Sequence, residues 1–126
     1  MGKGFEDLEI YQRSLALGDR IYQLVYGWDW FAKETVGKQI VRSIDSVAAN
    51  ISESFGRYHY NDRVRFIYFS RGSLYETHTW LTKAMQRKLI STDDYEIIES
   101  ELRLLGVKLN NFIQSIYKLS SANNNK

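Results

Sequence analysis

The sequence predicts an all-α protein, an antiparallel up-down-up-down four-helix bundle. The 126-residue chain contains no proline, and apolar residues recur every three or four positions along four long segments. Short polar stretches separate these segments, which favours antiparallel packing of consecutive helices. We expect a single domain over residues 1–121, with helices at about 6–27, 33–55, 62–88 and 92–120, followed by a disordered tail at 122–126.

The first predicted helix, residues 6–27, carries two adjacent apolar seams, so we expect it to contact more than one neighbour. One seam consists of Ile10, Ser14, Leu17, Ile21, Leu24 and Trp28. The other consists of Tyr11, Leu15, Gly18, Tyr22 and Val25. The second predicted helix, residues 33–55, carries one seam made of Val36, Ile40, Ile44, Val47, Ile51 and Phe55. Gly56 follows it and suits a left-handed C-terminal cap.

The third and fourth predicted helices also show one clear seam each. Residues 62–88, which begin at a cap formed by Asn61 or Asp62, have a seam of Ile67, Ser70, Leu74, Thr77, Leu81 and Ala84. Residues 92–120 have a seam of Tyr95, Ile98, Leu102, Leu105, Leu109, Phe112, Ile116 and Leu119. Ser91 precedes this last helix and predicts its N-cap.

Composition excludes several classes of protein. The chain has no cysteine, which removes disulfides, thiolate zinc sites and cysteine nucleophiles and fits a reducing cytoplasm. No apolar run reaches 18 residues and the first residues lack an apolar signal core, so we expect a cytoplasmic protein with no membrane partner. The formal net charge of +2 indicates no particular partner by itself.

No strong catalytic motif is present, and we expect a non-enzymatic protein without metal or cofactor. Glycine-rich phosphate loops, nucleophile elbows and His-Glu-x-x-His sites are missing. Neither His59 nor His78 has a Glu three residues before it, as a di-iron bundle requires. One enzymatic alternative stays open, because the spacing of Arg71 and His78 resembles the Arg-x(4–6)-His signature of HEPN ribonucleases.

Basic residues concentrate in residues 57–88, where seven Lys and Arg face two Asp and Glu. Aromatic rings interleaved with guanidinium groups suit nucleic acid, because rings stack on bases while cations neutralise phosphates. The same residue types are enriched at protein interfaces, which leaves a protein contact as the alternative. The candidate nucleic-acid-binding residues are Arg57, Tyr58, His59, Arg63, Arg65, Tyr68, Arg71, Lys83, Arg87 and Lys88.

Four polar residues of the second and third predicted helices are expected to fix the register of the bundle through inter-helix ion pairs and hydrogen bonds. They are Arg42, Asn50, Glu53 and Glu76. In a hairpin that turns near residue 59, Arg42 would lie level with Glu76, and Glu53 would lie near Arg63 or Arg65. A polar functional site is the alternative interpretation of the same residues.

Three motifs resemble a known family. They are Phe5-Glu6-Asp7-Leu8 with Tyr11-Gln12, Ser46–Glu53 running into Phe55-Gly56-Arg57, and Phe66-Ile67 with Arg71-Gly72-Ser73-Leu74 and Glu76. The chain resembles the four helix bundle protein family, which includes proteins encoded in intervening sequences of bacterial 23S ribosomal RNA genes. It is also similar to Avd, the accessory variability determinant of diversity-generating retroelements. It departs from the family pattern at Lys88, where a glycine is usual.

The resemblance implies a ring-like homo-oligomer, commonly a pentamer. For the Avd branch it also implies a basic surface for nucleic acid and a partner protein such as a reverse transcriptase. We therefore expect an oligomeric, non-enzymatic binding or accessory protein for RNA or DNA. The alternatives are a purely structural oligomer that contacts other proteins and the HEPN-like ribonuclease.

Overall fold

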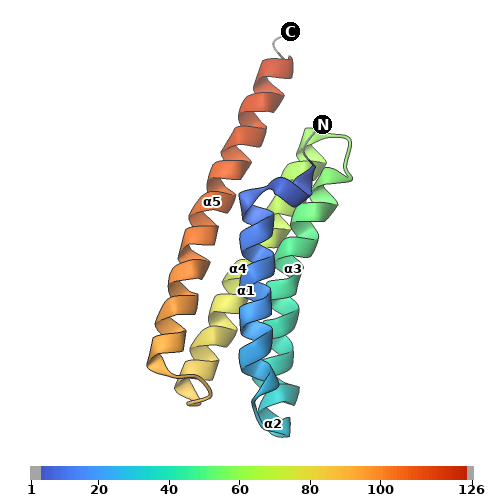
Figure 1. The fold of residues 1–126 in the computed structure, drawn as a ribbon. Helices are drawn as coiled ribbons and strands as arrows, with labels where there is room; N and C mark the ends of the chain where they lie inside the picture. Colours follow the sequence, from blue (N-terminus) through green and yellow to red (C-terminus); the bar gives the residue numbers. More distant parts are fainter. Residues whose placement is uncertain (1–3, 125–126) are drawn as a thin grey trace.

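The computed structural model describes residues 4–124 and is an all-α bundle of four long helices, as the sequence predicts (Figure 1). The long helices are α1 (Glu9–Tyr26), α3 (Lys38–Phe55), α4 (Tyr60–Gln86) and α5 (Thr92–Asn124). A short 3₁₀ turn, η1 (Phe5–Asp7), precedes α1. Between α1 and α3 the chain forms one helical turn, α2 (Trp30–Ala32), and a π-helical segment, η2 (Lys33–Gly37).

The four long helices form a closed square in which each one packs against two neighbours. α3 lies between α1 and α4, and α5 lies between α4 and α1. The α1–α3 pair and the α4–α5 pair therefore form opposite sides of the bundle. α3 packs most extensively against α4, whereas α5 packs less extensively against either of its neighbours. Within residues 4–124 no helix is long and apolar enough to cross a lipid bilayer.

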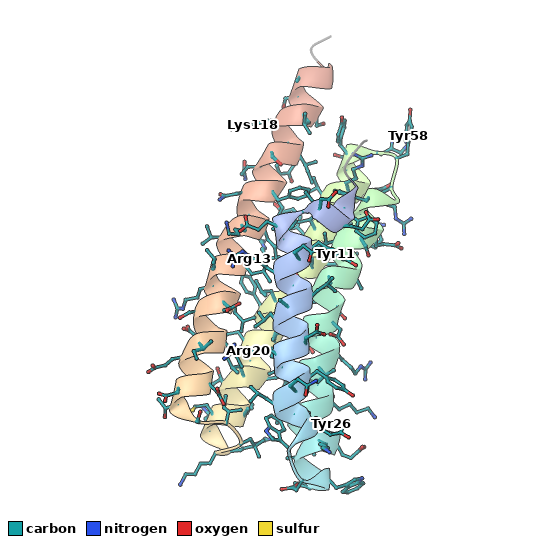
Figure 2. All side chains as sticks on the ribbon, in the orientation of Figure 1. Tyr11, Arg13, Arg20, Tyr26, Tyr58 and Lys118 are labelled. Atoms are coloured by element: carbon teal, nitrogen blue, oxygen red, sulfur yellow. The ribbon has the colours of Figure 1, made fainter. Side chains whose placement is uncertain are left out.

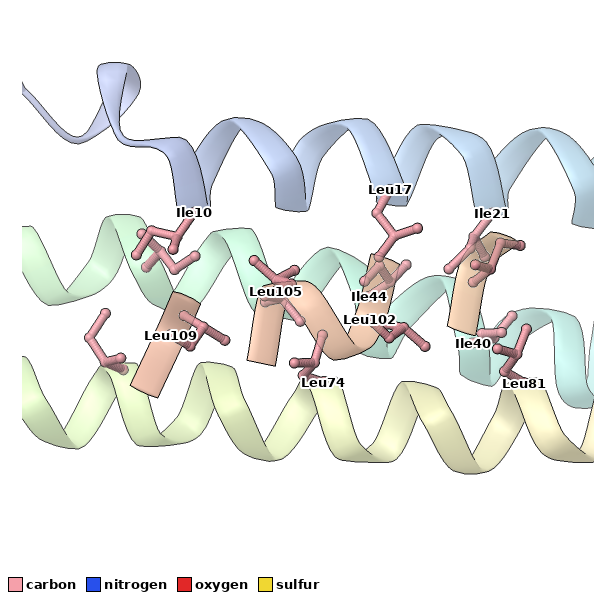
Figure 3. Packing of buried hydrophobic residues seen from close by; sticks show 14 of the residues in the cluster. Ile10, Leu17, Ile21, Ile40, Ile44, Leu74, Leu81, Leu102, Leu105 and Leu109 are labelled. Carbon is pink, nitrogen blue, oxygen red and sulfur yellow. The ribbon is translucent and has the colours of Figure 1, made fainter. Parts of the chain in front are cut away.

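The core consists of the aliphatic seams that the periodicity predicts, and it follows the bundle axis (Figure 3). Ile44 and Ile51 of α3 and Ile67 of α4 are completely enclosed. Full burial of one such side chain stabilises the fold by about 1.5–3 kcal/mol. The second seam of α1 behaves differently, because Leu15 and Tyr22 remain 41% and 50% exposed. Val25 of the same seam is buried and Tyr11 packs against the core, so this side of α1 is covered only in part.

α5 is longer than predicted and extends past the turn between α3 and α4 (Figure 1). The tail expected to be disordered from residue 122 is helical as far as Asn124, and residues 125–126 lie outside the described residues. Leu119, assigned to the predicted seam, is 57% exposed near this projecting end, while Ile113 joins the core. The predicted cap is present, because Ser91 Oγ accepts a hydrogen bond of 3.0 Å from the backbone N–H of Asp94.

The left-handed residue that ends a helix lies at Lys88 and not at Gly56. Gly56 has an ordinary right-handed φ of −79°, so the predicted left-handed cap there is wrong. Lys88 has a φ of 60°, and the backbone N–H of Leu89 donates to the carbonyl of Ala84 at 2.9 Å. This is the six-to-one hydrogen bond of a Schellman motif, in which glycine is the usual left-handed residue.

Buried hydroxyl groups set the register between α3 and α4. Ser70 Oγ donates to the carbonyl of Val47 at 2.8 Å, and Thr77 Oγ1 donates to Ser43 Oγ at the same distance. Ser70 and Thr77 are fully enclosed and Ser43 is 4% exposed. A hydrogen bond between such groups contributes about 0.5–1.5 kcal/mol, so the register in which both pairs meet is favoured.

The predicted inter-helix ion pairs are wrong, because each of the four polar residues bonds locally or lies apart from its expected partner. Glu53 accepts from Arg57 four residues later at 2.8 Å, and Glu76 accepts from the indole N–H of Trp80 at 3.0 Å. Asn50 donates to the carbonyl of Ser46. Within the described residues Arg42 forms no ion pair with Glu76. These side chains lie on the outer parts of their helices, where solvent competes for each charge.

Candidate nucleic-acid and protein interfaces

The ten candidate nucleic-acid residues do not form one continuous patch. Five of them gather at the turn between α3 and α4, which we call the hairpin tip: Arg57, Tyr58, His59, Arg63 and Arg65. Three others, Lys83, Arg87 and Lys88, lie at the opposite end of α4. At 1.5 Å per helical residue, about 30 Å separates Arg63 from Lys83. One nucleic-acid contact would therefore use the candidate residues at one end of α4, not those at both ends.

The hairpin tip presents arginines that rest on aromatic rings. The guanidinium carbon of Arg57 lies 4.4 Å from the ring centre of Phe66. The guanidinium carbon of Arg65, the residue before Phe66, lies 5.8 Å from the same ring centre. Arg63 Nε donates to the carbonyl of Arg57 at 2.9 Å. The carbonyl bond and the ring contacts restrain long side chains, which reduces the entropy lost when they bind a ligand.

Tyr58 is the most exposed of the large apolar side chains in the described chain, at 88%. It stands at the outer end of the turn, at the opposite end of the bundle from Tyr26 (Figure 2). Its ring meets the imidazole of His59 edge to face, with the ring centres 5.0 Å apart. His59 is the N-cap residue of α4, yet its side chain makes no capping hydrogen bond there. The tip thus combines an exposed ring with the uncapped, positively polarised end of a long helix.

The remaining two candidates, Tyr68 and Arg71, lie on the side of α4 that faces α5. The guanidinium carbon of Arg71 lies 4.6 Å from the ring centre of Tyr68 and 5.9 Å from that of Tyr75. Arg71 Nη1 also donates to Asn110 Oδ1 on α5 at 2.9 Å. A hydrogen bond with Tyr68 raises the pKa of the Tyr117 phenol on α5. These contacts make Arg71 and Tyr68 part of the α4–α5 packing.

An open groove of about 640 Å³ follows the seam between α4 and α5. We call it the α4–α5 groove, and its lining residues are Leu74, Tyr75, His78, Leu102, Arg103, Gly106, Val107 and Asn110. Its floor is apolar, and its outer edge includes Tyr75 and Val107, which are 59% and 57% exposed. This groove did not follow from the sequence, because the looser packing of α5 is a property of the assembled bundle.

His78 lines the same groove and Arg71 lies beside it, and both contact α5. His78 Nε2 lies 4.0 Å from Glu99 Oε1, and the same carboxylate forms an ion pair with Arg103. Arg71 is held by Asn110. The two HEPN-like residues therefore have protein partners within the protomer. Across residues 4–124 no three His, Cys, Asp or Glu side chains gather closely enough to hold a metal ion.

A second uncovered surface lies on the opposite side of the bundle, between α1 and α3. We call it the α1–α3 face, and a shallow depression there is lined by Tyr11, Ser14, Leu15, Asp19, Asp45, Ala48, Ala49 and Ser52. Asp45 Oδ1 lies 3.0 Å from the position that a Cβ on Gly18 would take. Burial, and secondly the neighbouring Asp19, raise the pKa of Asp45. The exposed second seam of α1 was the sequence signal for this face, whereas the acidic pair was not predicted.

Comparison with known proteins identifies the family. A family model described as 23S rRNA-intervening sequence protein matches residues 6–111. A crystal structure from Bacteroides thetaiotaomicron, described as a protein with unknown function from the S23 ribosomal protein family, superposes with a TM-score of 0.74 at 25% sequence identity. The match covers 82% of this chain and 97% of that one. No curated protein matches significantly. With the bundle and the family model in agreement over most of its length, the chain belongs to the 23S rRNA-intervening sequence protein family.

Proposed function

We propose that this protein is a non-enzymatic, self-associating accessory protein that binds nucleic acid through the hairpin tip. The observation that carries the proposal is the exposed Tyr58 ring, which lies at the hairpin tip beside Arg57 of the turn and Arg63 and Arg65 of the first turns of α4. An exposed ring offers stacking worth about 1–3 kcal/mol per base, and each nearby cation can neutralise one phosphate. The uncapped start of α4 adds backbone N–H groups, which also favour phosphate.

The absence of catalysis in this proposal rests on how the two suspected ribonuclease residues are occupied. Arg71 is held by Asn110, and His78 lies beside the Glu99 carboxylate. A ribonuclease would need Arg71 released from Asn110 to reach a scissile phosphate, since the 46% exposed His78 is not blocked by a carboxylate 4.0 Å away. Incubation of the protein with RNA should therefore yield no cleavage products. Cleavage that disappears in His78→Ala would instead establish the HEPN-like ribonuclease.

Self-association in five copies and a partner protein such as a reverse transcriptase belong to the proposal through the resemblance stated above. The exposed apolar residues of the α4–α5 groove and the α1–α3 face support a protein contact, since contiguous apolar surface on a small domain marks interaction sites. Measurement of the solution mass by light scattering tests the number of copies.

The binding test uses fluorescence anisotropy with a labelled structured RNA and a DNA of the same sequence. The matching family's description names 23S rRNA, so a structured fragment of that RNA is the first probe. We expect Tyr58→Ala and Arg65→Ala to weaken binding, with Arg65→Ala reducing the salt slope by about one phosphate contact. Arg87→Ala is the matched control, because it removes the same charge at the other end of α4.

Equal losses in Arg65→Ala and Arg87→Ala would contradict the assignment of the tip, because a diffuse charge effect would then explain the binding. No salt-dependent binding to either nucleic acid would contradict the proposal itself. In that case the protein–protein alternative would become the leading function, and the two uncovered sides of the bundle would be its surfaces.

A further inference from the structure

The hairpin tip continues along α4 as a strip of rings and arginines that the ten candidate residues cover only in part. We call it the α4 strip, and it consists of Arg57, Arg65, Phe66 and Phe69. The guanidinium of Arg57 lies over the Phe66 ring. The rings of Phe66 and Phe69 meet edge to face, with their centres 5.4 Å apart. The strip is therefore continuous from the turn to Phe69.

Phe69 is an exposed ring with open surface beside it. Its side chain is 50% exposed, whereas that of Phe66 is partly buried. A Cβ on Gly72 would meet no atom within 4 Å. Because residues three apart lie on the same side of a helix, the surface next to Phe69 is open as well. A ligand that reaches the Phe69 ring therefore finds room along α4.

Arg65 supplies positive charge that is free to meet a ligand. It is exposed, and across residues 4–124 it enters no ion pair. It lies four residues before Phe69, which makes the two side chains neighbours on one face of α4. Arg57 is paired with Glu53 at 2.8 Å, but the two side chains are 41% and 52% exposed. A surface pair of this kind contributes little stability, so a phosphate can replace Glu53.

Two exposed rings, Tyr58 and Phe69, favour nucleic acid whose bases are unpaired. An aromatic ring binds a base by stacking on its flat face. Inside a duplex the neighbouring base pairs cover both faces of each base, whereas loops, bulges and single strands leave them accessible. Since every base has such a face, stacking of this kind tolerates many sequences.

We propose that the hairpin tip and the α4 strip together bind an unpaired stretch of nucleic acid, with one base on Tyr58 and another on Phe69. Arg57 and Arg65 hold the phosphates of the same stretch. This inference rests on the nucleic-acid binding of the proposed function. It specifies the form of the ligand and adds Phe69 to the site.

The test compares three labelled probes of equal length by fluorescence anisotropy. They are an unstructured oligothymidine, the same backbone without bases, and a blunt-ended duplex. The abasic strand offers phosphates but nothing to stack on the rings. We therefore expect the wild type to bind oligothymidine about tenfold more tightly than the abasic strand.

Removal of either ring should weaken only the binding of unpaired bases. Tyr58→Ala and Phe69→Ala should each weaken oligothymidine binding about tenfold and leave binding of the abasic strand and the duplex unchanged. Tyr75→Ala is the matched control, because this exposed ring of α4 lines the α4–α5 groove instead of the strip, and it should bind like the wild type.

Two further variants separate stacking from an effect on folding. Phe69→Tyr keeps a ring and should retain binding of oligothymidine. Circular dichroism melting checks that every variant folds. If Phe69→Ala does not fold, Phe69→Leu removes the ring while it keeps an apolar side chain of similar reach.

Two results would overturn this inference while leaving nucleic-acid binding at the hairpin tip intact. If the wild type bound the abasic strand as tightly as oligothymidine, and Arg65→Ala weakened both, the tip would contact phosphates alone. If Phe69→Ala behaved like Tyr75→Ala, the site would end at Tyr58. An absence of salt-dependent binding to all three probes would contradict the proposed function itself, and the strip would then be tested as a contact for a protein partner.

Discussion

Thr77 of α4 and Ser43 of α3 bring their hydroxyl oxygens to 2.8 Å inside the bundle, where Thr77 is fully enclosed. Ser43 in turn donates to the carbonyl of Ile40 at 3.1 Å. This short polar chain crosses the most extensive helix contact of the fold. Its position makes it a register marker, because sliding one helix by a turn would separate the two oxygens and leave each hydroxyl with only the carbonyl of its own helix.

Replacing this hydroxyl should destabilise the protein without changing its shape. Thr77→Val preserves the branched side chain and removes the hydrogen bond to Ser43, so we expect the free energy of unfolding to fall by about 1–2 kcal/mol. Urea unfolding followed by circular dichroism measures the change. Thr82→Val on the same helix is the control, because Thr82 bonds only to the nearby carbonyl of His78 at the surface. Equal effects of both substitutions would contradict the register role.

The left-handed backbone at Lys88 predicts a stabilising substitution. A non-glycine residue in this conformation costs roughly 1 kcal/mol, so Lys88→Gly should raise the free energy of unfolding by about that amount. Thermal unfolding measures it as an increase in Tm. Arg87→Gly removes the same charge at a φ of −88° and should give no increase. A gain in both variants would indicate a charge effect instead.

Two helix glycines should respond in opposite directions to alanine. A Cβ on Gly37 would lie 2.8 Å from Val25 Cγ1 and 3.1 Å from the carbonyl of Ala32, so Gly37→Ala should lower stability by about 1–3 kcal/mol. A Cβ on Gly72 meets no atom within 4 Å, and Gly72→Ala should raise stability by about 0.5–1 kcal/mol. Parallel urea titrations compare the two. A loss at Gly72 would contradict the open space found around this position.

Two carboxylates should give opposite pH dependences in dilute, monomeric protein. The pKa of Asp45 is raised by burial and by Asp19, so its ionised form disfavours folding at neutral pH. Asp45→Asn should then increase stability at pH 7, and the gain should disappear as pH falls through the raised pKa. Hydrogen bonds from Arg13 and Lys108 lower the pKa of Glu9.

Glu9→Gln should therefore decrease stability at pH 7. That loss should vanish at low pH, because the wild-type carboxylate loses its advantage as pH falls through its lowered pKa. Urea unfolding from pH 3 to pH 7 compares both variants with the wild type. Parallel curves for Asp45→Asn and the wild type would contradict the raised pKa.

Apolar periodicity predicted the helices and most of the core, because a seam such as Ile67, Leu74 and Leu81 has to face inward whatever the neighbours are. It did not predict which polar groups join the helices. The charged residues of α3 and α4 were predicted to join the two helices, yet Glu53 bonds locally to Arg57. Between α3 and α4 the inter-helix bonds instead come from Ser70 and Thr77, which lie within the predicted seam and whose partners depend on the final packing.

The sequence suggested ten candidate residues but did not predict how the structure arranges them. The ten residues were grouped because they share one stretch of sequence, whereas a helix of 27 residues carries its two ends far apart. The α4–α5 groove and the acidic pair at Asp19 and Asp45 depend on which helices become neighbours. Which helices become neighbours depends on how the whole chain packs, and no local sequence pattern predicts it.

The ion pair between Glu9 and Lys108 closes the square of helices, joining residues 99 positions apart at 3.0 Å. The other three sides of the square join long helices that follow one another along the chain. Since the entropy lost in closing a loop grows with its length, we expect the three sides formed by consecutive helices to pack first. The contact between α1 and α5, which closes the longest stretch of chain, is then expected to form last.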